Sequence, residues 1–106
     1  MTAQTQAGRM FAAIRRIRLK PGMVEEYTKR MRTGALPMMK EMDGFKAFYV
    51  VVSADDTLTS LSLFTNKSVA ETSTQTLMPW IKENLGPLLI SFPEVIDGEV
   101  VISEVQ

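Results

Sequence analysis

The segment Phe45–Val52, with the sequence Phe-Lys-Ala-Phe-Tyr-Val-Val-Val, decides the fold of this chain. Its residues read as a β-strand, in which alternate side chains point to opposite faces. One face carries Phe45, Ala47, Tyr49 and Val51, and the other carries Lys46, Phe48, Val50 and Val52. A strand of a small antiparallel sheet normally turns a polar face to water, but this strand has none. We therefore expect helices to cover one face of the sheet and a second copy of the chain to cover the other, at Phe48 and Val50.

Turn residues and changes of period divide the rest of the chain around this strand. Residues 10–19 alternate loosely and stop at Lys20-Pro21-Gly22, which predicts a first strand. Residues 57–65 follow a polar turn at residues 53–56 and predict the second strand of a hairpin. Residues 95–105 predict a last strand that is broken by Asp97-Gly98.

Two helices are predicted from apolar residues that recur every three or four positions. The first begins at Met23, and Pro37 predicts a kink near Leu36, because an interior proline costs a regular helix about 3 kcal/mol. The second begins at the capping box Ser68–Glu71. The predicted buried stripe of the first helix contains Val24, Tyr27, Met31, Ala35, Met38 and Met42.

The order strand, helix, strand, strand, helix, strand predicts an α+β fold. Short right-handed connections arrange it as a ferredoxin-like βαββαβ unit, with a four-stranded antiparallel sheet and two helices on one face. We expect a flexible N-terminal tail over residues 1–9 and a single domain over residues 10–106. The bare face of the sheet predicts a homodimer in which two sheets face each other, a dimeric α+β barrel.

Composition excludes several classes of partner. The chain has 106 residues, and its 12 basic residues balance its 12 acidic residues. A neutral chain gives no electrostatic reason to bind nucleic acid or an anionic membrane. No apolar run is long enough to span a membrane, and the first residues lack the pattern of a signal peptide. We therefore expect a cytoplasmic protein without nucleic-acid or membrane partners.

The chain contains no cysteine and no histidine. It therefore cannot supply a thiolate nucleophile, a Ser-His-Asp triad, a His-based zinc site or the usual axial ligand of haem. We expect no metal and no other cofactor. Any chemistry falls to carboxylates, Tyr, Lys, Arg, Asn or Trp, or to the reactivity of the substrate itself.

Five residues are candidates for binding a small molecule, whereas no catalytic residue can be assigned. Trp80 and Asn84 lie one turn apart on the apolar stripe of the second helix, and Tyr27 and Tyr49 are the only phenols of the chain. Arg16 shares a strand face with apolar residues and is a candidate for binding an anion.

Each candidate also has a structural alternative. Trp80 and the two tyrosines would pack in the core, and Asn84 would cap a helix. Arg16 would pair with Glu99 or Glu104 on a neighbouring strand. Methionines around both helices suit either an adaptable apolar pocket or an ordinary small core. They are Met23, Met31, Met38, Met39, Met42 and Met78.

Several short motifs occur in an order that is typical of one family. They are Lys20-Pro21-Gly22 after the first strand, Asp43-Gly44-Phe45 at the start of the second, Asn66–Ala70 at the start of the second helix, and Trp80 late in that helix. Through their order and spacing, the chain resembles the antibiotic biosynthesis monooxygenase-like family of the dimeric α+β barrel superfamily, over about residues 10–105.

The resemblance implies a homodimer with a small-molecule pocket between sheet and helices in each protomer. It also implies oxygenase chemistry without metal or flavin, on phenolic or anthrone-like substrates that react with oxygen once deprotonated. Haem-degrading relatives use an asparagine on the first strand with a tryptophan and a histidine near the second helix. This chain has Trp80, but it has no histidine and no asparagine between Met10 and Lys20, so haem degradation is not expected.

The sequence leads to two hypotheses for the function of this protein. The first is a cofactor-independent, monooxygenase-like protein that acts on a small aromatic or phenolic molecule. The alternative is a non-catalytic homodimer that binds a small apolar ligand or serves as a structural module. The sequence does not decide between them, because fold alone confers no activity.

Overall fold

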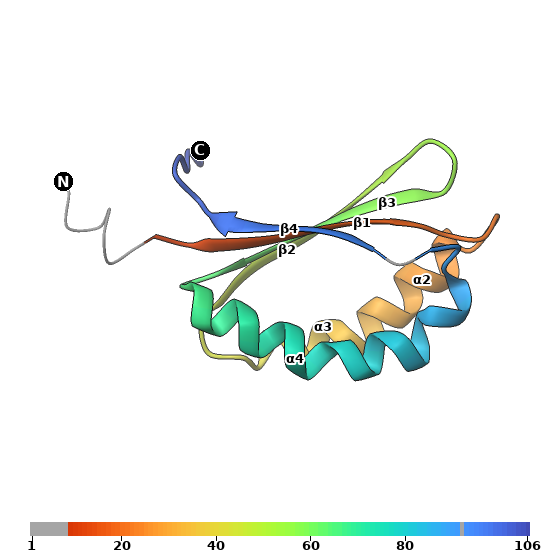
Figure 1. The fold of residues 1–106 in the computed structure, drawn as a ribbon, viewed down its shortest axis with the longest axis horizontal. Coiled ribbons are helices and arrows are strands. Elements are labelled where there is room, and N and C mark those ends of the chain that lie inside the picture. Colours follow the sequence, from red (N-terminus) through yellow and green to blue (C-terminus); the bar gives the residue numbers. More distant parts are fainter. Residues whose placement is uncertain (1–8, 92) are drawn as a thin grey trace.

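The chain folds into two layers, a sheet and a pair of helical segments that cover one of its faces (Figure 1). The computed structural model describes residues 9–91 and 93–106, so the predicted tail over residues 1–9 lies outside the described residues except for Arg9. None of the helices in the described ranges is long and apolar enough to cross a membrane. The elements are β1 (Phe11–Arg18), α2 (Val24–Arg30), a π-turn η1 (Met31–Ala35), α3 (Leu36–Lys40), β2 (Phe45–Ser53), β3 (Thr57–Phe64), α4 (Lys67–Asn84), a 3-10 turn η2 (Gly86–Leu88) and β4 (Glu94–Glu99).

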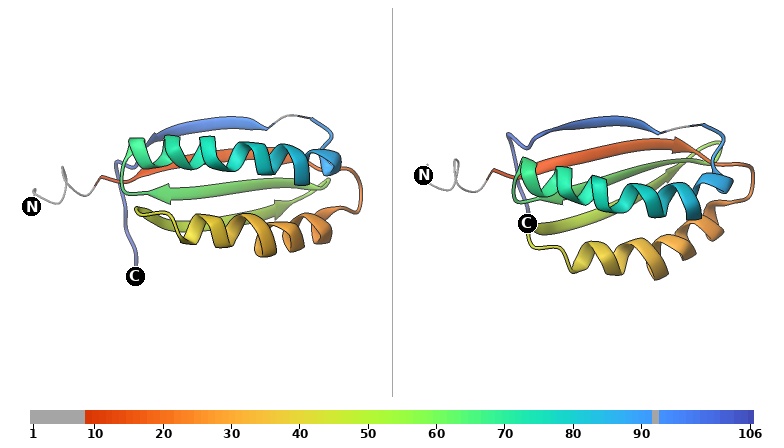
Figure 2. Two further views of the ribbon diagram at one scale, coloured as in Figure 1. Left: turned by 90° about the horizontal axis from the view of Figure 1, so that it is seen from below. Right: turned by 60° about the horizontal axis from the view of Figure 1, so that its bottom comes forward.

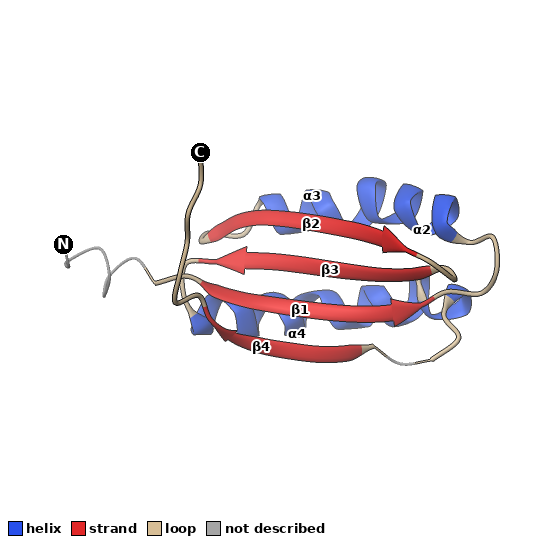
Figure 3. Cartoon of the chain, turned by 90° about the horizontal axis from the view of Figure 1, so that it is seen from above, coloured by secondary structure: helices blue, strands red, loops and turns tan. Residues whose placement is uncertain are grey.

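The four strands form one antiparallel sheet in the order β2-β3-β1-β4, as Figure 3 shows. The helical segment α2-η1-α3 and the helix α4 lie side by side under the same face of this sheet (Figure 2). The predicted ferredoxin-like α+β fold is therefore confirmed. The core lies between the two layers, and its largest fully buried apolar side chains are Leu19, Met39, Leu58, Phe64 and Leu85.

Strand β2 turns its faces the opposite way from our prediction. Phe48 pairs with Ser62 and Val50 with Ser60, and both apolar side chains pack against the core under the helices. A β-bulge at Lys46 causes this, because the extra residue places Phe45 and Phe48 on the same face although they are three positions apart. The face left bare by the helices is therefore the one that carries Tyr49.

The outer sheet face, which we define as the face opposite the helices, carries a continuous apolar row. Tyr49 on β2 pairs with Leu61 on β3, which pairs with Ile14 on β1, which pairs with Ile96 on β4. Tyr49 is 57% exposed and Ile96 is 67% exposed. Ala12, Ala47 and Leu63 extend the same surface. An apolar strip that crosses every strand of a sheet is typical of a surface that meets another protein.

A π-turn interrupts the first helical segment one turn before the kink that Pro37 predicts. The buried residues of this segment are spaced by exactly four positions, at Tyr27, Met31, Ala35 and Met39. In a regular α-helix, at about 100° per residue, Met39 would point about 120° away from Tyr27. The wider π-turn removes most of this rotation. Met39 therefore takes the fully buried place that we predicted for Met38, which is only partly buried.

Two predicted boundaries are wrong, for different reasons. The side chain of Asn66, not that of Ser68, caps α4: its Oδ1 accepts a hydrogen bond of 3.0 Å from the backbone N–H of Val69. Strand β4 runs through Asp97-Gly98 without the predicted break and ends at Glu99 instead of residue 105. It pairs with β1, which begins at Phe11 opposite Glu99, and among the described residues one further backbone hydrogen bond follows, from the N–H of Val100 to the carbonyl of Met10. The residues that follow expose Val101, Ile102 and Val105.

Candidate functional site

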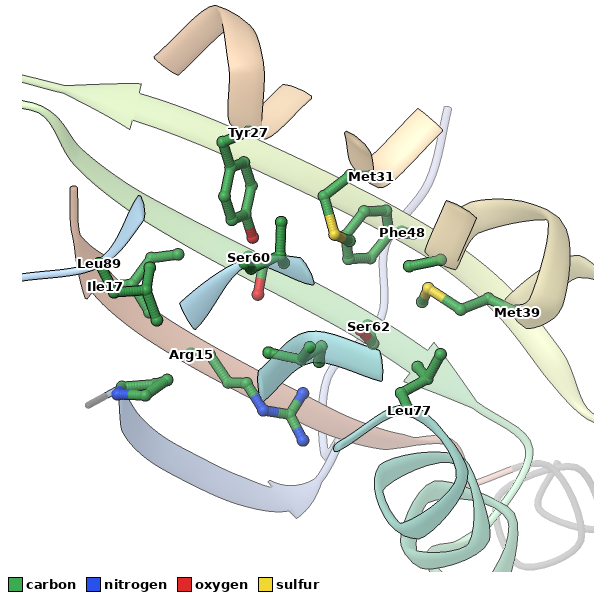
Figure 4. A pocket seen from close by; sticks show the side chains of 14 residues that line it. Arg15, Ile17, Tyr27, Met31, Met39, Phe48, Ser60, Ser62, Leu77 and Leu89 are labelled. Carbon is green, nitrogen blue, oxygen red and sulfur yellow. The ribbon is translucent and has the colours of Figure 1, made fainter. Parts of the chain in front are cut away.

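A cavity of about 50 Å³ lies between the sheet and the helices. Strands β1, β2 and β3 supply its roof, and α2, η1, α3 and α4 supply its floor (Figure 4). Most of its wall is apolar and includes Met31, Met39, Phe48, Leu77, Leu85 and Leu89. An apolar cavity with a few polar groups is the usual form of a small-molecule site.

The polar groups of the wall are Arg15, Tyr27, Ser60 and Ser62. The sheet register places Arg15 and the two serines together, because Arg15 pairs with Ser60, and Ser62 is the next residue of β3 that faces inward. Tyr27 approaches them from α2. In Figure 4 the hydroxyl group of Tyr27 points toward Ser60, whose own hydroxyl group points away from Tyr27. None of the three hydroxyl groups forms a hydrogen bond with another group in the described part of the chain. No fully enclosed side-chain polar atom of that part lacks a partner, so the three hydroxyl oxygens keep some accessible surface and are open to a ligand.

Arg15 reaches from the sheet toward α4. Its Nη2 donates a hydrogen bond of 2.9 Å to Oγ1 of Thr74. This bond holds the guanidinium at the side of the cavity and leaves several of its five N–H donors for other partners.

Tyr27 is 4% exposed, and this burial raises the pKa of its phenol to about 12. The positive charge of Arg15 acts in the opposite direction and lowers the pKa, so the guanidinium lies within electrostatic range of the phenol. The Tyr27 hydroxyl therefore keeps its proton near neutral pH. It can donate a hydrogen bond at neutral pH but cannot act as a base there.

Because the pKa of Tyr27 is raised in the folded state, we expect the stability of the protein to fall at high pH. The phenol has a pKa of 10.0 when unfolded and about 12 when folded, so its contribution is complete below pH 10 and is lost as pH rises toward 12. Between pH 9 and pH 11, the free energy of unfolding should fall by about 1.4 kcal/mol more in wild type than in Tyr27→Phe. Urea unfolding at both pH values measures this difference, and equal losses in the two proteins would contradict it.

A groove of about 360 Å³ on the surface adjoins the cavity. It lies between α2-η1 and the edge strand β2, and Tyr27, Met31 and Phe48 line both spaces. These three side chains therefore separate the cavity from the groove. Methionine changes conformer easily, so Met31 is the part of this partition that can move at least cost.

The structure brings one of the five predicted ligand-binding residues, Tyr27, into the cavity. Tyr49 and Arg16 lie on the outer sheet face. Arg16 forms a salt bridge of 2.8 Å with Glu94, which stands directly opposite on β4, instead of with Glu99 or Glu104.

Trp80 and Asn84 lie in the helical layer and are not among the residues that line the cavity. The indole of Trp80 packs on Gly34 of η1, so closely that a Cβ atom at Gly34 would lie 2.1 Å from Cζ2 of the ring. The side-chain amide of Asn84 donates a hydrogen bond of 3.0 Å to the carbonyl of Trp80 in the same helix. Both side chains thus have partners within the fold.

Sequence reasoning missed Arg15, Ser60 and Ser62. A signal for the serines exists in β3, where they alternate with outward residues and share a face with the buried Leu58 and Phe64. No comparable signal separates Arg15 from Arg16, because both faces of β1 carry apolar residues. Within residues 9–91 and 93–106, His, Cys, Asp and Glu form no group of three that could hold a metal ion.

Comparison with known proteins agrees with this architecture. The model of the antibiotic biosynthesis monooxygenase family matches residues 10–77, from β1 into α4. The chain therefore belongs to the antibiotic biosynthesis monooxygenase family. No curated protein matches it in sequence.

Solved structures share the fold at low sequence identity. A protein of unknown function from Nitrosomonas europaea has a TM-score of 0.80 and 18% identity, over 94% of this chain and 97% of that one. Rv0793 from Mycobacterium tuberculosis has a TM-score of 0.73 and 14% identity, over 92% and 99%. The monooxygenase from the gene ActVA-Orf6 of Streptomyces coelicolor, in complex with the ligand Nanaomycin D, has a TM-score of 0.76 and 14% identity, over 91% of each chain.

Proposed function

We propose that this protein is a monooxygenase-like enzyme that binds a small phenolic molecule in the cavity between its sheet and its helices. The observation that carries this proposal is the set of unpaired hydroxyl groups, of Tyr27, Ser60 and Ser62, in an otherwise apolar wall. Membership of the family supports a monooxygenase-like role, and one protein of similar fold holds a small ligand, Nanaomycin D.

The proposed reaction draws its electrons from the substrate. In a phenol that carries a ring CH₂ group, the two C–H bonds break, one atom of O₂ forms a carbonyl at that carbon, and the other oxygen atom leaves as water with the two hydrogens. The hydroxyl donors of the wall would orient the substrate oxygen, and the apolar residues would exclude water while oxygen reacts. The work of the protein is positioning and desolvation.

Binding requires the cavity to enlarge. A space of about 50 Å³ holds water molecules but not an aromatic ring, whereas the adjoining groove has about 360 Å³. Movement of Met31 and Phe48 would join the two spaces, because these side chains line both. We therefore propose that the groove between η1 and β2 is the entrance for the ligand.

One observation favours the alternative, a non-catalytic protein that binds a small ligand. No carboxylate lines the cavity among the described residues, and Tyr27 keeps its proton because its pKa is about 12. The wall therefore offers no general base near neutral pH. In this alternative the same side chains bind the ligand and no oxygen is consumed.

We also propose that the protein is a homodimer in which two outer sheet faces meet. The apolar row of Tyr49, Leu61, Ile14 and Ile96 supports this assembly, because helices cover only the opposite face of the sheet. The same row gives two copies a self-complementary surface about a two-fold axis. The cytoplasmic location stays a prediction from the sequence.

A ligand screen by thermal shift, followed by oxygen-uptake assays with each phenol that binds, tests the proposed function. We expect phenols to raise the melting temperature and at least one of them to consume oxygen. Tyr27→Phe should weaken the binding of that phenol about tenfold, because the hydroxyl donor is lost. Tyr49→Phe is the matched control and should change binding less than twofold. Binding without oxygen uptake would favour the non-catalytic alternative, and no phenol binding would contradict both.

A further inference from the structure

We propose that Arg15 makes the cavity selective for an aromatic oxyanion, so that a phenol binds there as its phenolate. This inference rests on the proposed function, because it specifies the ligand of the same cavity. It adds a specificity-determining residue, Arg15, to that proposal.

The placement of Arg15 follows from the alternation of β1. Ala13 and Ile17 are buried under the helices, and Arg15 lies between them on the same face. Arg16, the next residue, points to the outer sheet face and pairs with Glu94. Two consecutive arginines therefore serve opposite sides of the sheet, and only Arg15 belongs to the cavity.

The charge of Arg15 has no anionic partner among residues 9–91 and 93–106. Arg16 and Arg30 both form salt bridges with glutamates, whereas the partner of Arg15 is the neutral hydroxyl of Thr74. Across the sheet Arg15 faces Val95 of β4, and Asp97 lies one inward position further along without reaching salt-bridge distance. A partly buried guanidinium without a carboxylate is a ready site for an anionic ligand.

The other polar groups of the cavity act in the same direction. Tyr27, Ser60 and Ser62 each bring an O–H that can donate, and no carboxylate of the described chain lines the cavity as a competing acceptor. A phenol oxygen that has lost its proton accepts several hydrogen bonds and carries the charge that complements Arg15. The neutral phenol carries no such charge, so the site discriminates between the two forms.

Ionisation of the ligand needs no base from the protein. The O–H bond of the phenol breaks, its electron pair stays on the oxygen, and the proton passes to water. Arg15 then stabilises the oxyanion by charge and hydrogen bonding in surroundings of low dielectric constant. A carboxylate base in the described wall is therefore not required, because the guanidinium favours the ionised ligand without accepting its proton.

The test uses 4-nitrophenol, whose phenolate has its own visible absorption band, and 4-nitroanisole, which has a similar shape but cannot ionise. In wild type we expect the pKa of 4-nitrophenol to fall by about one unit when it binds. This corresponds to binding of the phenolate about tenfold tighter than that of the neutral phenol. Arg15→Met should abolish this shift and weaken phenolate binding about tenfold. Binding of 4-nitroanisole should change less than twofold.

Arg16→Met is the matched control, because it removes the neighbouring arginine from the other side of the sheet. It should leave both the spectral shift and the affinity unchanged. Arg15→Lys keeps the charge and should retain part of the shift, which keeps the test decisive if the methionine variant does not fold. A phenolate that binds with equal affinity to wild type and Arg15→Met would overturn the role of Arg15 and leave the proposed function standing. Failure of wild type to bind either probe, together with failure of the wider phenol screen, would overturn both proposals.

Discussion

Leu61→Asp is expected to convert the protein into a monomer. Leu61 stands in the middle of the apolar row, between Tyr49 of β2 and Ile14 of β1. In the proposed dimer the new carboxylate would be buried against the partner's apolar surface, and Arg16, the next outward residue of β1 after Ile14, is already paired with Glu94. Burying an unpaired charge costs several kcal/mol, so we expect the dissociation constant to rise at least about 100-fold.

Sedimentation velocity across a range of concentrations measures this change. Gln75→Asp provides the control, because it adds the same charge on the exposed side of α4, away from the outer sheet face. Circular dichroism should show that both variants keep the fold. A wild type that sediments as a monomer at micromolar concentration would rule out the dimer, and an unchanged dimer in Leu61→Asp would place the interface elsewhere.

Gly34→Ala is expected to destabilise the protein by about 3 kcal/mol. A methyl group at this position would lie 2.1 Å from Cζ2 and 2.7 Å from Cε2 of Trp80. The obstacle is a rigid ring held between the helices, so rotation of a flexible side chain cannot relieve the overlap. The cost of separating η1 from α4 should therefore exceed the gain in helix propensity from glycine to alanine.

Urea unfolding followed by circular dichroism gives the stability of each variant. Gly86→Ala is the matched control, since nothing lies within 4 Å of a Cβ atom at that glycine, and its stability should stay close to that of wild type. Removing the obstacle should restore part of the loss, so Trp80→Leu should cost less in the Gly34→Ala background than in wild type. Additive losses would show that the two residues do not compete for the same space.

The order of the elements could be predicted because local residue patterns mark the start and end of each element. Turn residues at Lys20-Pro21-Gly22 and Asp43-Gly44, and the change from a two-residue to a four-residue period, are visible without a structure. The faces of β2 were not predictable in the same way. Both faces are apolar, and the bulge at Lys46 exchanges them without a distinct local signal.

The buried face of the first helical segment was predicted correctly as far as Ala35. The prediction is wrong at the next position, where Met39 is buried instead of Met38. An α-helical template adds about 100° per residue and selects Met38, whereas the π-turn delays the rotation by about one residue. The cue was present in the strict four-residue spacing of the buried side chains, which a regular helix cannot keep on one face for three turns.

The candidate site was predicted least well, because it depends on pairing between distant strands. Arg15 and Arg16 are chemically identical neighbours, and only the register with β3 and β4 decides which of them meets the cavity. Trp80 was a candidate because it lies on the apolar stripe of the second helix, yet its position against Gly34 comes from contact between two helices. Such contacts leave little trace in a single sequence.

Because side chains alternate along β1, this strand also couples dimerisation to ligand binding. Ile14 belongs to the surface proposed for the dimer and Arg15 to the cavity, so a single peptide unit separates the two. The sheet is one layer of backbone, and a change of its twist moves both faces together. Thermodynamic reciprocity then sets a strict rule: a ligand that binds the dimer more tightly than the monomer strengthens the dimer by the same factor per site. Measuring the dissociation constant of the dimer with and without a phenol reports how much free energy passes through the sheet.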